Sequence, residues 1–487
     1  MASAVTYGEG AIVPRRYAGL AFRDIVAPLL GALCALVAAG GAAAADLDSL
    51  RPTAAALRDK ALASPRAYEI TEALTTEVGA RPAGSPAMIK AADWAVARLK
   101  TLGFDKVWTE SFPVAAWERG PESAAVVAPY PQALAVAALG NSVPTPAGGI
   151  EAEIAVFATY EALLAAPAGS LAGKIAVVNQ PMPRTQGPDG YFATTRIRSG
   201  ASEAARRGAV AYLVRSLSTG SSRSPHTGGM RYLPDLPRIP AAALGTPDAD
   251  LLARMAARGR PVRIKLALSS RIREGAETRT VVAEFTGREA PEEIVLIGAH
   301  LDSWDLGTGA VDDASGVGLV VDAAKLIAEL PQRPRRTIRV ALFGAEEIGG
   351  SAAAYAARHG PEEQARHIIA SEADTGADKV YLAELPAGAA SAPFGRMFAD
   401  LVSPLGIVVS QTAATDGGAD LSRLKDVPLA LLQQDLTTYF DLHHSADDTF
   451  DKVDRHRLAQ ATAAWTVLTY LVAESDVDFR KGMRTSP

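Results

Sequence analysis

The sequence contains almost no cysteine: Cys34 is the only one among 487 residues. A single thiol cannot form an intramolecular disulfide, so the fold does not depend on disulfide bonds, and the chain beyond residue 34 has no thiol for catalysis. The rest of the composition is ordinary for a protein with a folded core, since 48% of the residues are hydrophobic and 21% are charged. At this length we expect two or more domains.

An excess of positive charge is also missing. The chain has 49 Lys and Arg residues against 54 Asp and Glu residues, a formal net charge of −5, and the two signs are scattered. The absence of a basic stripe argues against nucleic acid as a partner. The HExxH, GxSxG and P-loop motifs are absent as well, so three common hydrolase and nucleotide-binding chemistries have no candidate site.

The N-terminal 45 residues differ in composition from the rest. A basic stretch with Arg15 and Arg16 precedes an apolar run over residues 25–39, and small residues follow in GGAAAAD. This order is typical of a secretory signal peptide, so we predict that residues 1–45 are cleaved near Ala45 and that the mature protein is secreted or periplasmic. The run is short for a membrane span, and we expect no stable span in the mature chain. The route of export, general secretory or twin-arginine, stays open.

The first part of the mature chain, residues 46–120, has the pattern of an α/β domain. Apolar spacing predicts amphipathic helices over residues 67–78 and 88–102, followed by a strand over 105–114. From about residue 121 the sequence pattern changes to short predicted strands separated by Pro and Gly residues.

The last part, residues 271–487, alternates apolar strands with helices, including predicted helices over 315–330 and 455–474. This alternation predicts an α/β fold with a mainly parallel, mixed sheet sandwiched by helices. Residues 121–270, which include a predicted helix over 202–214, are then a smaller, β-rich insertion into one catalytic domain whose two parts are 46–120 and 271–487.

Metal-type side chains stand at or just after the carboxyl ends of the predicted strands, where open α/β sheets place their sites. One carboxylate can bridge two ions while each ion takes one histidine and one further carboxylate, which suits Zn²⁺ and leaves a bridging position for water. Glu346 directly precedes one of these ligands and is the candidate general base. The candidate ligands are His300, Asp312, Glu347, Asp374 and His444.

Two of these assignments stay open on the residues alone. Asp312 is followed directly by Asp313, and either carboxylate could bridge two ions. His443 and His444 are likewise neighbours, and either imidazole could bind metal.

Other polar residues have possible supporting roles. Asp302 follows His300 by two positions and could accept its second imidazole N–H, which would fix the tautomer. Tyr439 and Asp420, the latter in the polar loop TDGGAD, are candidates for binding a substrate terminus. The remaining histidines are expected on the surface: His226, His359, His367 and His456.

Four motifs carry a resemblance to a known family. They are HLDSWDLGTGAVDDASG, AEEIGG, SEADTGA and YFDLHHSADDT, all between residues 296 and 450. This stretch resembles the co-catalytic zinc exopeptidases that include bacterial leucyl aminopeptidases and glutamate carboxypeptidases. The resemblance implies the zinc exopeptidase fold, and it explains residues 121–270 as an inserted protease-associated domain.

The resemblance also implies roles for individual residues. It makes the five candidate ligands zinc ligands, with Asp312 bridging, and it makes Glu346 the base. Of the two histidines in HHSADDT, the second is the ligand in this family, which favours His444 over His443.

We therefore predict an exported exopeptidase with two Zn²⁺ ions per chain. It would hydrolyse dipeptides or short peptides through a metal-bridging water, with Glu346 as general base. An aminopeptidase acting on longer peptides, a single-zinc cyclase-like enzyme and a non-catalytic peptide-binding protein are the alternatives, and the intact Glu346 argues against the last. A small peptide is the expected partner, and formation of a homodimer stays open.

Overall fold

The structure is a computed structural model that describes residues 47–483. The predicted signal peptide and Cys34 therefore lie outside the described residues. Between residues 47 and 483, no helix combines the length and the apolar character needed to cross a membrane. The described residues all belong to one compact unit.

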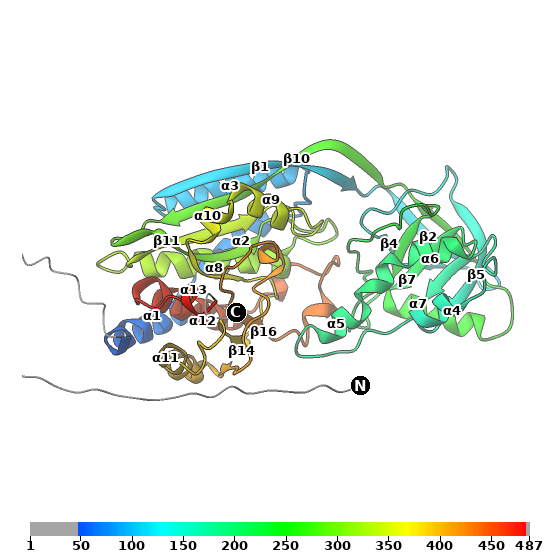
Figure 1. Cartoon of the computed structure of the whole chain (residues 1–487). Coiled ribbons are helices and arrows are strands. Elements are labelled where there is room, and N and C mark those ends of the chain that lie inside the picture. The colour runs from blue at the N-terminus through cyan, green and yellow to red at the C-terminus, as the bar shows by residue number, and fades with distance from the viewer. Residues whose placement is uncertain (1–46, 484–487) are drawn as a thin grey trace, which may run out of the picture. The chain divides into compact units, whose positions relative to one another are not determined.

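A five-stranded mixed sheet forms the centre of one part of the protein (Figure 1). Strands β12 (Arg336–Phe343), β11 (Ala290–His300) and β13 (His367–Glu372) are parallel, as predicted. Beside them, β10 (Arg271–Phe285) is antiparallel to β12, and β1 (Lys106–Glu118) is antiparallel to β10. The prediction of a mainly parallel sheet is thus wrong at this edge. The loop between β10 and β11 is too short for a crossover helix, so the two strands run in opposite directions.

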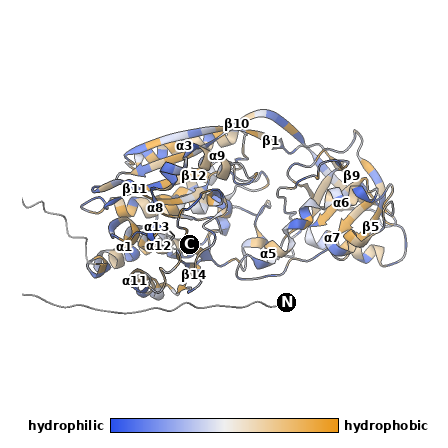
Figure 2. Ribbon diagram, in the orientation of Figure 1, coloured by the Kyte–Doolittle hydropathy of each residue, from blue (hydrophilic) through white to orange (hydrophobic). Residues whose placement is uncertain are grey.

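The sheet has helices on both faces, and its side chains divide between two cores. Along β11, Ile297 packs on the face covered by α8 (Ser315–Ala328) and α12 (Arg455–Glu474). Leu296 points to the opposite face, where α9 (Ser351–Arg358) packs. This alternation is the two-residue period of a strand buried on both faces. Hydrophobic and hydrophilic residues are mixed along the edge strand β1 and its neighbour β10 (Figure 2), and β10 is exposed at its start but buried from Thr280 to Phe285.

Side-chain caps set the starts of two helices near the sequence-predicted positions. Ser85 accepts a hydrogen bond from Met88 N at the start of α3 (Pro86–Thr101), with proline at the first helical position. Asp454 accepts hydrogen bonds from two backbone N–H groups at the start of α12. The other helices and 3-10 turns of this part are η1 (Leu47–Leu50), α1 (Arg51–Ala63), α2 (Arg66–Glu77), α10 (Pro361–Gln364), α11 (Pro393–Val402), η4 (Ser403–Leu405), η5 (Ala419–Leu421), η6 (Tyr439–Asp441), η7 (Phe450–Lys452) and α13 (Arg480–Met483).

A small three-stranded sheet extends the central one. It consists of β15 (Val408–Val409), β14 (Val380–Glu384) and β16 (Leu431–Gln434). The segment just before β16 runs parallel to β13 through a bridge between Ala370 and Leu429. The chain that leads to His444 therefore starts next to the parallel strands.

Between β1 and β10 the chain forms a separate eight-stranded sheet with its own apolar cores. Its side chains also alternate between two faces, because Val177 and Val178 belong to different cores. The strands are β2 (Glu122–Ala128), β3 (Gln132–Leu134), β4 (Val136–Ala138), β5 (Ile150–Phe157), β6 (Ile175–Val178), β7 (Ala211–Arg215), β8 (Ala241–Leu244) and β9 (Arg263–Leu268). The helical segments are α4 (Tyr160–Ala165), α5 (Asp189–Thr194), η2 (Thr195–Gly200), α6 (Ala201–Arg206) and α7 (Thr246–Ala256).

The single helix predicted over residues 202–214 is wrong. The structure has α6 up to Arg206 and then strand β7 from Ala211. Gly208, with φ +91°, ends the helix in the left-handed region, where glycine carries no steric penalty. The apolar residues that follow are a buried strand, and a short apolar run does not distinguish a strand from a helix.

Candidate metal centre

Three neighbouring parallel strands bring most of the candidate ligands to one edge of the sheet. His300 is the last residue of β11, Glu347 follows β12 and Asp374 follows β13. Asp312 lies in the short helical turn η3 (Ala310–Ala314) directly before α8. Because the carboxyl ends of parallel strands meet at one edge, residues far apart in sequence become neighbours here.

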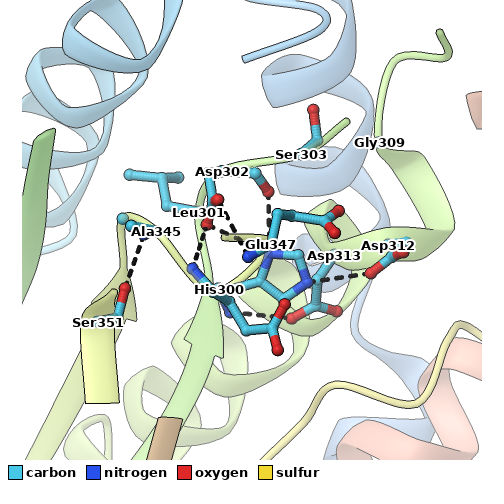
Figure 3. Close-up of polar contacts among 12 residues, drawn as sticks. His300, Leu301, Asp302, Ser303, Gly309, Asp312, Asp313, Ala345, Glu347 and Ser351 are labelled. Atoms are coloured by element: carbon cyan, nitrogen blue, oxygen red, sulfur yellow. Dashed lines mark hydrogen bonds and ion pairs between the residues drawn. The ribbon is translucent and has the colours of Figure 1, made fainter. Parts of the chain in front are cut away.

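Asp312 stands between two histidine–carboxylate pairs. On one side His300 Nε2 lies 3.0 Å from Asp312 Oδ1 (Figure 3) and 3.3 Å from Asp374 Oδ1. On the other side His444 Nε2 lies 3.3 Å from Asp312 Oδ2 and 3.0 Å from Glu347 Oε2. Each oxygen of one carboxylate thus faces one imidazole and one further carboxylate, which is the arrangement expected of a bridging residue.

The structure separates Asp312 from Asp313, which are joined by a cis peptide bond. Asp313 Oδ2 accepts a hydrogen bond from His300 N at 3.1 Å, and its Oδ1 accepts one from Gly316 N at 3.0 Å. Among residues 47–483, Asp312 Oδ2 is buried and has no hydrogen-bond partner. Asp313 is therefore occupied by backbone groups, whereas Asp312 is available to a cation.

His444 and His443 both face Asp312, but only His444 also contacts Glu347. His443 Nε2 lies 3.7 Å from Asp312 Oδ2, and the two imidazole rings stack with centroids 3.5 Å apart. Asp312, His443 and His444 form one group of possible ligands, and His300, Asp312 and Asp374 form the other. His444 has φ +61°, a left-handed conformation that is uncommon outside glycine and that is found at functional sites.

Asp302 positions the site differently from the prediction. His300 Nδ1 donates to the backbone oxygen of Asp302 at 2.9 Å, while the Asp302 carboxylate is 3.6 Å away. The carboxylate instead accepts from Glu346 N at 3.0 Å and from Glu347 N at 3.3 Å (Figure 3). A proton on Nδ1 leaves His300 Nε2 free to bind a metal. Asp302 thus orients His300 through its carbonyl and orients the two glutamates through its side chain.

Burial and crowding raise the proton affinity of three of the site's carboxylates. Asp312 differs: burial would raise its pKa, but hydrogen bonds with His300 and His444 outweigh burial and hold the pKa well below its usual value. Burial, and then the charge of Asp374, raises the pKa of Glu346 well above its usual value. Burial likewise raises the pKa of Glu347 and of Asp374, although His444 and His300 oppose the increase. Several buried acidic groups that repel one another are the electrostatic condition that bound cations relieve. The donor set therefore fits divalent metal ions.

Sequence and structure comparisons identify the family of the chain. The sequence profile of peptidase family M28 matches residues 280–469. Carboxypeptidase Q from Mus musculus is 36% identical over 414 residues, which cover 84% of this chain and 86% of the mouse protein. The chain belongs to peptidase family M28. It is therefore a metallopeptidase, a class of hydrolase.

Solved structures agree with this assignment of the chain as an M28 peptidase. The crystal structure of a peptidase M28 precursor from Shewanella amazonensis SB2B is 44% identical and has a TM-score of 0.86, with 89% of this chain and 98% of that chain covered. A zinc aminopeptidase from Bacillus subtilis shares the fold with a TM-score of 0.61 at 18% identity, covering 84% of this chain and 95% of that chain.

Two buried residues that the sequence analysis missed hold this M28 peptidase's metal-centre loops. The Arg81 side chain is fully buried and donates to Leu301 O at 2.5 Å, Thr308 O at 2.6 Å and Gly309 O at 2.9 Å. Asp448 Oδ1 accepts from two backbone N–H groups at the start of η3, and burial raises the pKa of Asp448 to about 7. Asp448 belongs to the HHSADDT motif and could have been found there, whereas Arg81 lies in a turn with no such signal.

The candidate substrate residues have different environments. A cavity of about 860 Å³ opens over the metal centre, and Glu346 and Tyr439 are among its lining residues. Asp420 is buried beside this cavity and is not one of its lining residues. Its backbone N donates to the Glu372 side chain at 2.9 Å. Neighbours of Asp420 in the same loop, Gly418 and Ala419, do line the cavity.

The surface prediction for the remaining histidines is wrong for three of the four. His226, His359 and His367 are buried, and only His456 is exposed. His359 lies in a buried ion-pair cluster, 3.0 Å from Glu110. Polar neighbours in sequence predicted exposure, but the tertiary fold buries all three imidazoles, and within residues 47–483 His226 Nδ1 and His367 Nε2 have no hydrogen-bond partner.

Proposed function

We propose that this M28 peptidase is an exported, zinc-dependent exopeptidase that hydrolyses dipeptides and other short peptides. The observation that carries the proposal is the position of Asp312 between two histidine–carboxylate pairs. That arrangement offers two adjacent sets of ligands inside a cavity large enough for a small peptide.

The donor atoms suit two zinc ions. Imidazole nitrogens and carboxylate oxygens are the ligands that Zn²⁺ accepts when no thiolate is present. One ion would be held by His300, Asp374 and Asp312, and the other by His444, Glu347 and Asp312. Zinc bound there supplies Lewis acidity, which polarises a peptide carbonyl and acidifies water.

Glu346 is the proton acceptor in this proposal. Among residues 47–483 its carboxylate has no hydrogen-bond or ion-pair partner, and it lines the cavity. It would take a proton from the attacking water as the new C–O bond forms and return it to the amine nitrogen as the C–N bond breaks. Asp302 would position Glu346 by accepting its backbone N–H, so that the side chain projects into the cavity.

The rest of the chain is assigned in the same proposal. Residues 46–120 and 271–487 would form the peptidase domain, and residues 121–270 would be an inserted protease-associated domain. The separate sheet between β1 and β10 supports this division, because β1 and β10 pair directly with each other on either side of it. Residues 1–45 would direct export, which N-terminal sequencing of the secreted protein tests: a first residue near position 46 is expected, and an intact Met1 would contradict it.

Metal content and turnover test the central claim. Purified mature protein, reconstituted with zinc, is expected to bind two zinc ions per chain and to hydrolyse unblocked dipeptides. Glu346→Gln is expected to keep both ions and to lose about 10²–10⁴-fold in kcat, the usual contribution of a general base. Glu362→Gln, at an exposed position on α10, is the matched control and should retain kcat. Full activity with one zinc ion would reject the two-metal centre, and wild-type turnover by Glu346→Gln would reject the base.

A further inference from the structure

Trp304 lies in the loop after β11, but its side chain packs into the insertion. The indole ring is 8% exposed and is buried in the apolar core of the eight-stranded sheet, where it lies edge-on to Trp117. Gly140 of the insertion has no side chain at the point of closest approach, and a Cβ there would lie 2.0 Å from an atom of the ring. The ring therefore fills a space that the insertion leaves open for it.

The same residue contacts the metal centre on its other side. Its backbone N donates to Glu347 Oε1 at 3.2 Å, and its ring lies against the His444 ring, with centroids 5.7 Å apart. A small cavity of about 10 Å³ is bounded by Trp304 together with Asp312, Glu347 and His444. These three residues are the proposed ligands of one ion, and the two remaining ligands of the other ion do not line this cavity. Trp304 thus forms a wall of one metal site only.

An ion pair ties the next residue of this loop to the insertion as well. Arg119 donates to both oxygens of the Asp305 carboxylate, at 2.7 and 3.0 Å. It also donates to Ala138 O at 2.8 Å and to the Thr227 hydroxyl at 3.0 Å. Thr227 in turn donates its backbone N–H to His444 O at 2.9 Å. The loop after β11 and His444 are therefore held by the same part of the insertion.

The ligands of the other proposed ion have their supports in the central sheet. His300 is the last residue of β11, and its Nδ1 donates to the Asp302 backbone oxygen. Asp374 follows β13, and the residue before it donates its backbone N–H to Gly298 O in β11. All of these partners lie outside the insertion. The two proposed ions therefore differ in which part of the chain holds their ligands.

The size of the Trp304 ring matters more than its polarity. Within residues 47–483, its Nε1 is buried without a hydrogen-bond partner, which is destabilising. A smaller apolar side chain would avoid this penalty, but it would not reach from Gly140 on one side to the His444 ring on the other. Because close-packed interiors transmit strain, a shift of the ring displaces the groups that pack against it.

From these contacts we infer that Trp304 is a positioning residue that makes one of the two metal sites depend on the packing of the insertion. The inference rests on the proposed function and concerns the regulation of the same metal centre. The ion held by Glu347 and His444 binds tightly only while the insertion is packed around Trp304. The ion held by His300 and Asp374 binds independently of the insertion.

Zinc affinity measured on each site separately tests this inference. His300→Ala removes a ligand of one ion and His444→Ala a ligand of the other, so each protein keeps one complete site for competition with a chromophoric chelator. Trp304→Leu should weaken zinc binding about 10-fold or more in the His300→Ala background, the usual effect of losing a support of a metal ligand. In the His444→Ala background the same substitution should leave the Kd nearly unchanged. Equal effects in both backgrounds would overturn the inference.

A substitution within the insertion gives a second test, which holds even if Trp304→Leu fails to fold. Gly140→Ala leaves every residue of the metal centre unchanged, but its Cβ would displace the Trp304 ring. It should lower zinc affinity about 10-fold or more in His300→Ala protein and leave it unchanged in His444→Ala protein. Gly360→Ala is the matched control, because nothing lies within 4 Å of its Cβ, and it should leave both affinities unchanged. Unchanged affinity of both sites in Gly140→Ala protein would overturn the inference.

A second control separates the position of Trp304 from the stability of the insertion. Leu252, on α7, is buried in the same apolar core but does not line the small cavity beside the metal ligands. Leu252→Ala should lower the melting temperature, because it leaves a cavity in that core, and keep both zinc affinities. A loss of zinc affinity in Leu252→Ala equal to that in Trp304→Leu would show general destabilisation and overturn the specific role of Trp304.

Hydrolysis of a dipeptide separates this inference from the proposed function. If Trp304→Leu weakens only the site of Glu347 and His444, while wild-type protein loaded with two zinc ions hydrolyses no dipeptide, the inference stands and the proposed function fails. If the wild type hydrolyses dipeptides with two ions bound, but Trp304→Leu affects both sites equally, the proposed function stands and the inference fails.

Discussion

Arg81 offers the most quantitative test of how the metal centre is held in place. Its guanidinium joins the residue after His300 to the Thr308–Gly309 turn that precedes Asp312, through hydrogen bonds to three backbone carbonyls. Arg81→Met keeps an apolar stem of similar length and removes all of these donors. The three carbonyls are then left without their present donors, at about 1–1.5 kcal/mol each. The variant should therefore lose about 3–5 kcal/mol of unfolding free energy, the usual range for breaking a buried charged network.

The assay is guanidinium unfolding followed by circular dichroism on chelator-treated protein, so that metal binding does not contribute to the free energy. Arg263→Met is the control, because Arg263 forms an exposed ion pair with Glu151 and should cost less than about 1 kcal/mol. Zinc affinity, measured by competition with a chromophoric chelator, should also fall about 10-fold or more in Arg81→Met, since the loop of Asp312 loses its support. A stability loss as small as that of Arg263→Met would refute the reasoning.

Three further variants probe the supports of the site and the fold. Asp302→Asn should lower kcat about 10- to 100-fold with zinc still bound, because an amide cannot accept both backbone N–H groups that the carboxylate accepts; unchanged kcat would contradict this. Gly316→Ala should reduce the yield of folded protein or its stability by more than about 2 kcal/mol in a melting experiment, because a Cβ there would overlap Ala373 O, and a wild-type melting temperature would be inconsistent with the packing. Burial lowers the pKa of His359, but its contacts with Glu110 and Glu363 outweigh this and hold the pKa above its usual value of 6.5. The charged His359 thus stabilises the fold fully below about pH 6.5 and loses this effect as the pH rises through the higher folded pKa. His359→Gln should therefore cost more unfolding free energy at pH 6 than at pH 9. An equal cost at both pH values would refute the claim that His359 is charged in the fold.

The sequence predicted the elements whose residues interact locally. The helix over residues 455–474 has the bounds of α12, because an aspartate cap and a continuous buried run define it. The antiparallel edge formed by β1 and β10 was not predictable in the same way. These two strands are separated by the whole inserted section, and their pairing depends on contacts between residues such as Lys106 and Glu284 that no local pattern relates.

In the candidate site too, local sequence patterns were predictive and tertiary contacts were not. The candidate ligands at strand ends could be predicted from the sequence, because parallel strands bring their carboxyl ends together. The structure places His300, Asp312 and Asp374 close to one another there. The Asp302 carboxylate was assigned to the wrong partner, since backbone N–H groups of the next strand's loop compete for it and sequence spacing does not reveal them. Arg81 gave no signal at all, because only the tertiary fold brings its guanidinium to the backbone carbonyls of the loops around Leu301 and Gly309.

The inserted section and the metal centre are parts of one structure. Trp304 donates its backbone N–H to the Glu347 carboxylate at 3.2 Å, while its ring is buried in the apolar core of the eight-stranded sheet. Thr227 of the insertion reaches back to His444 O. Two of the three proposed ligands of one ion, Glu347 and His444, are therefore positioned by contacts with the insertion. It follows that the central sheet carries most of the candidate ligands at its edge, whereas contacts with the eight-stranded sheet hold Glu347 and His444 in place.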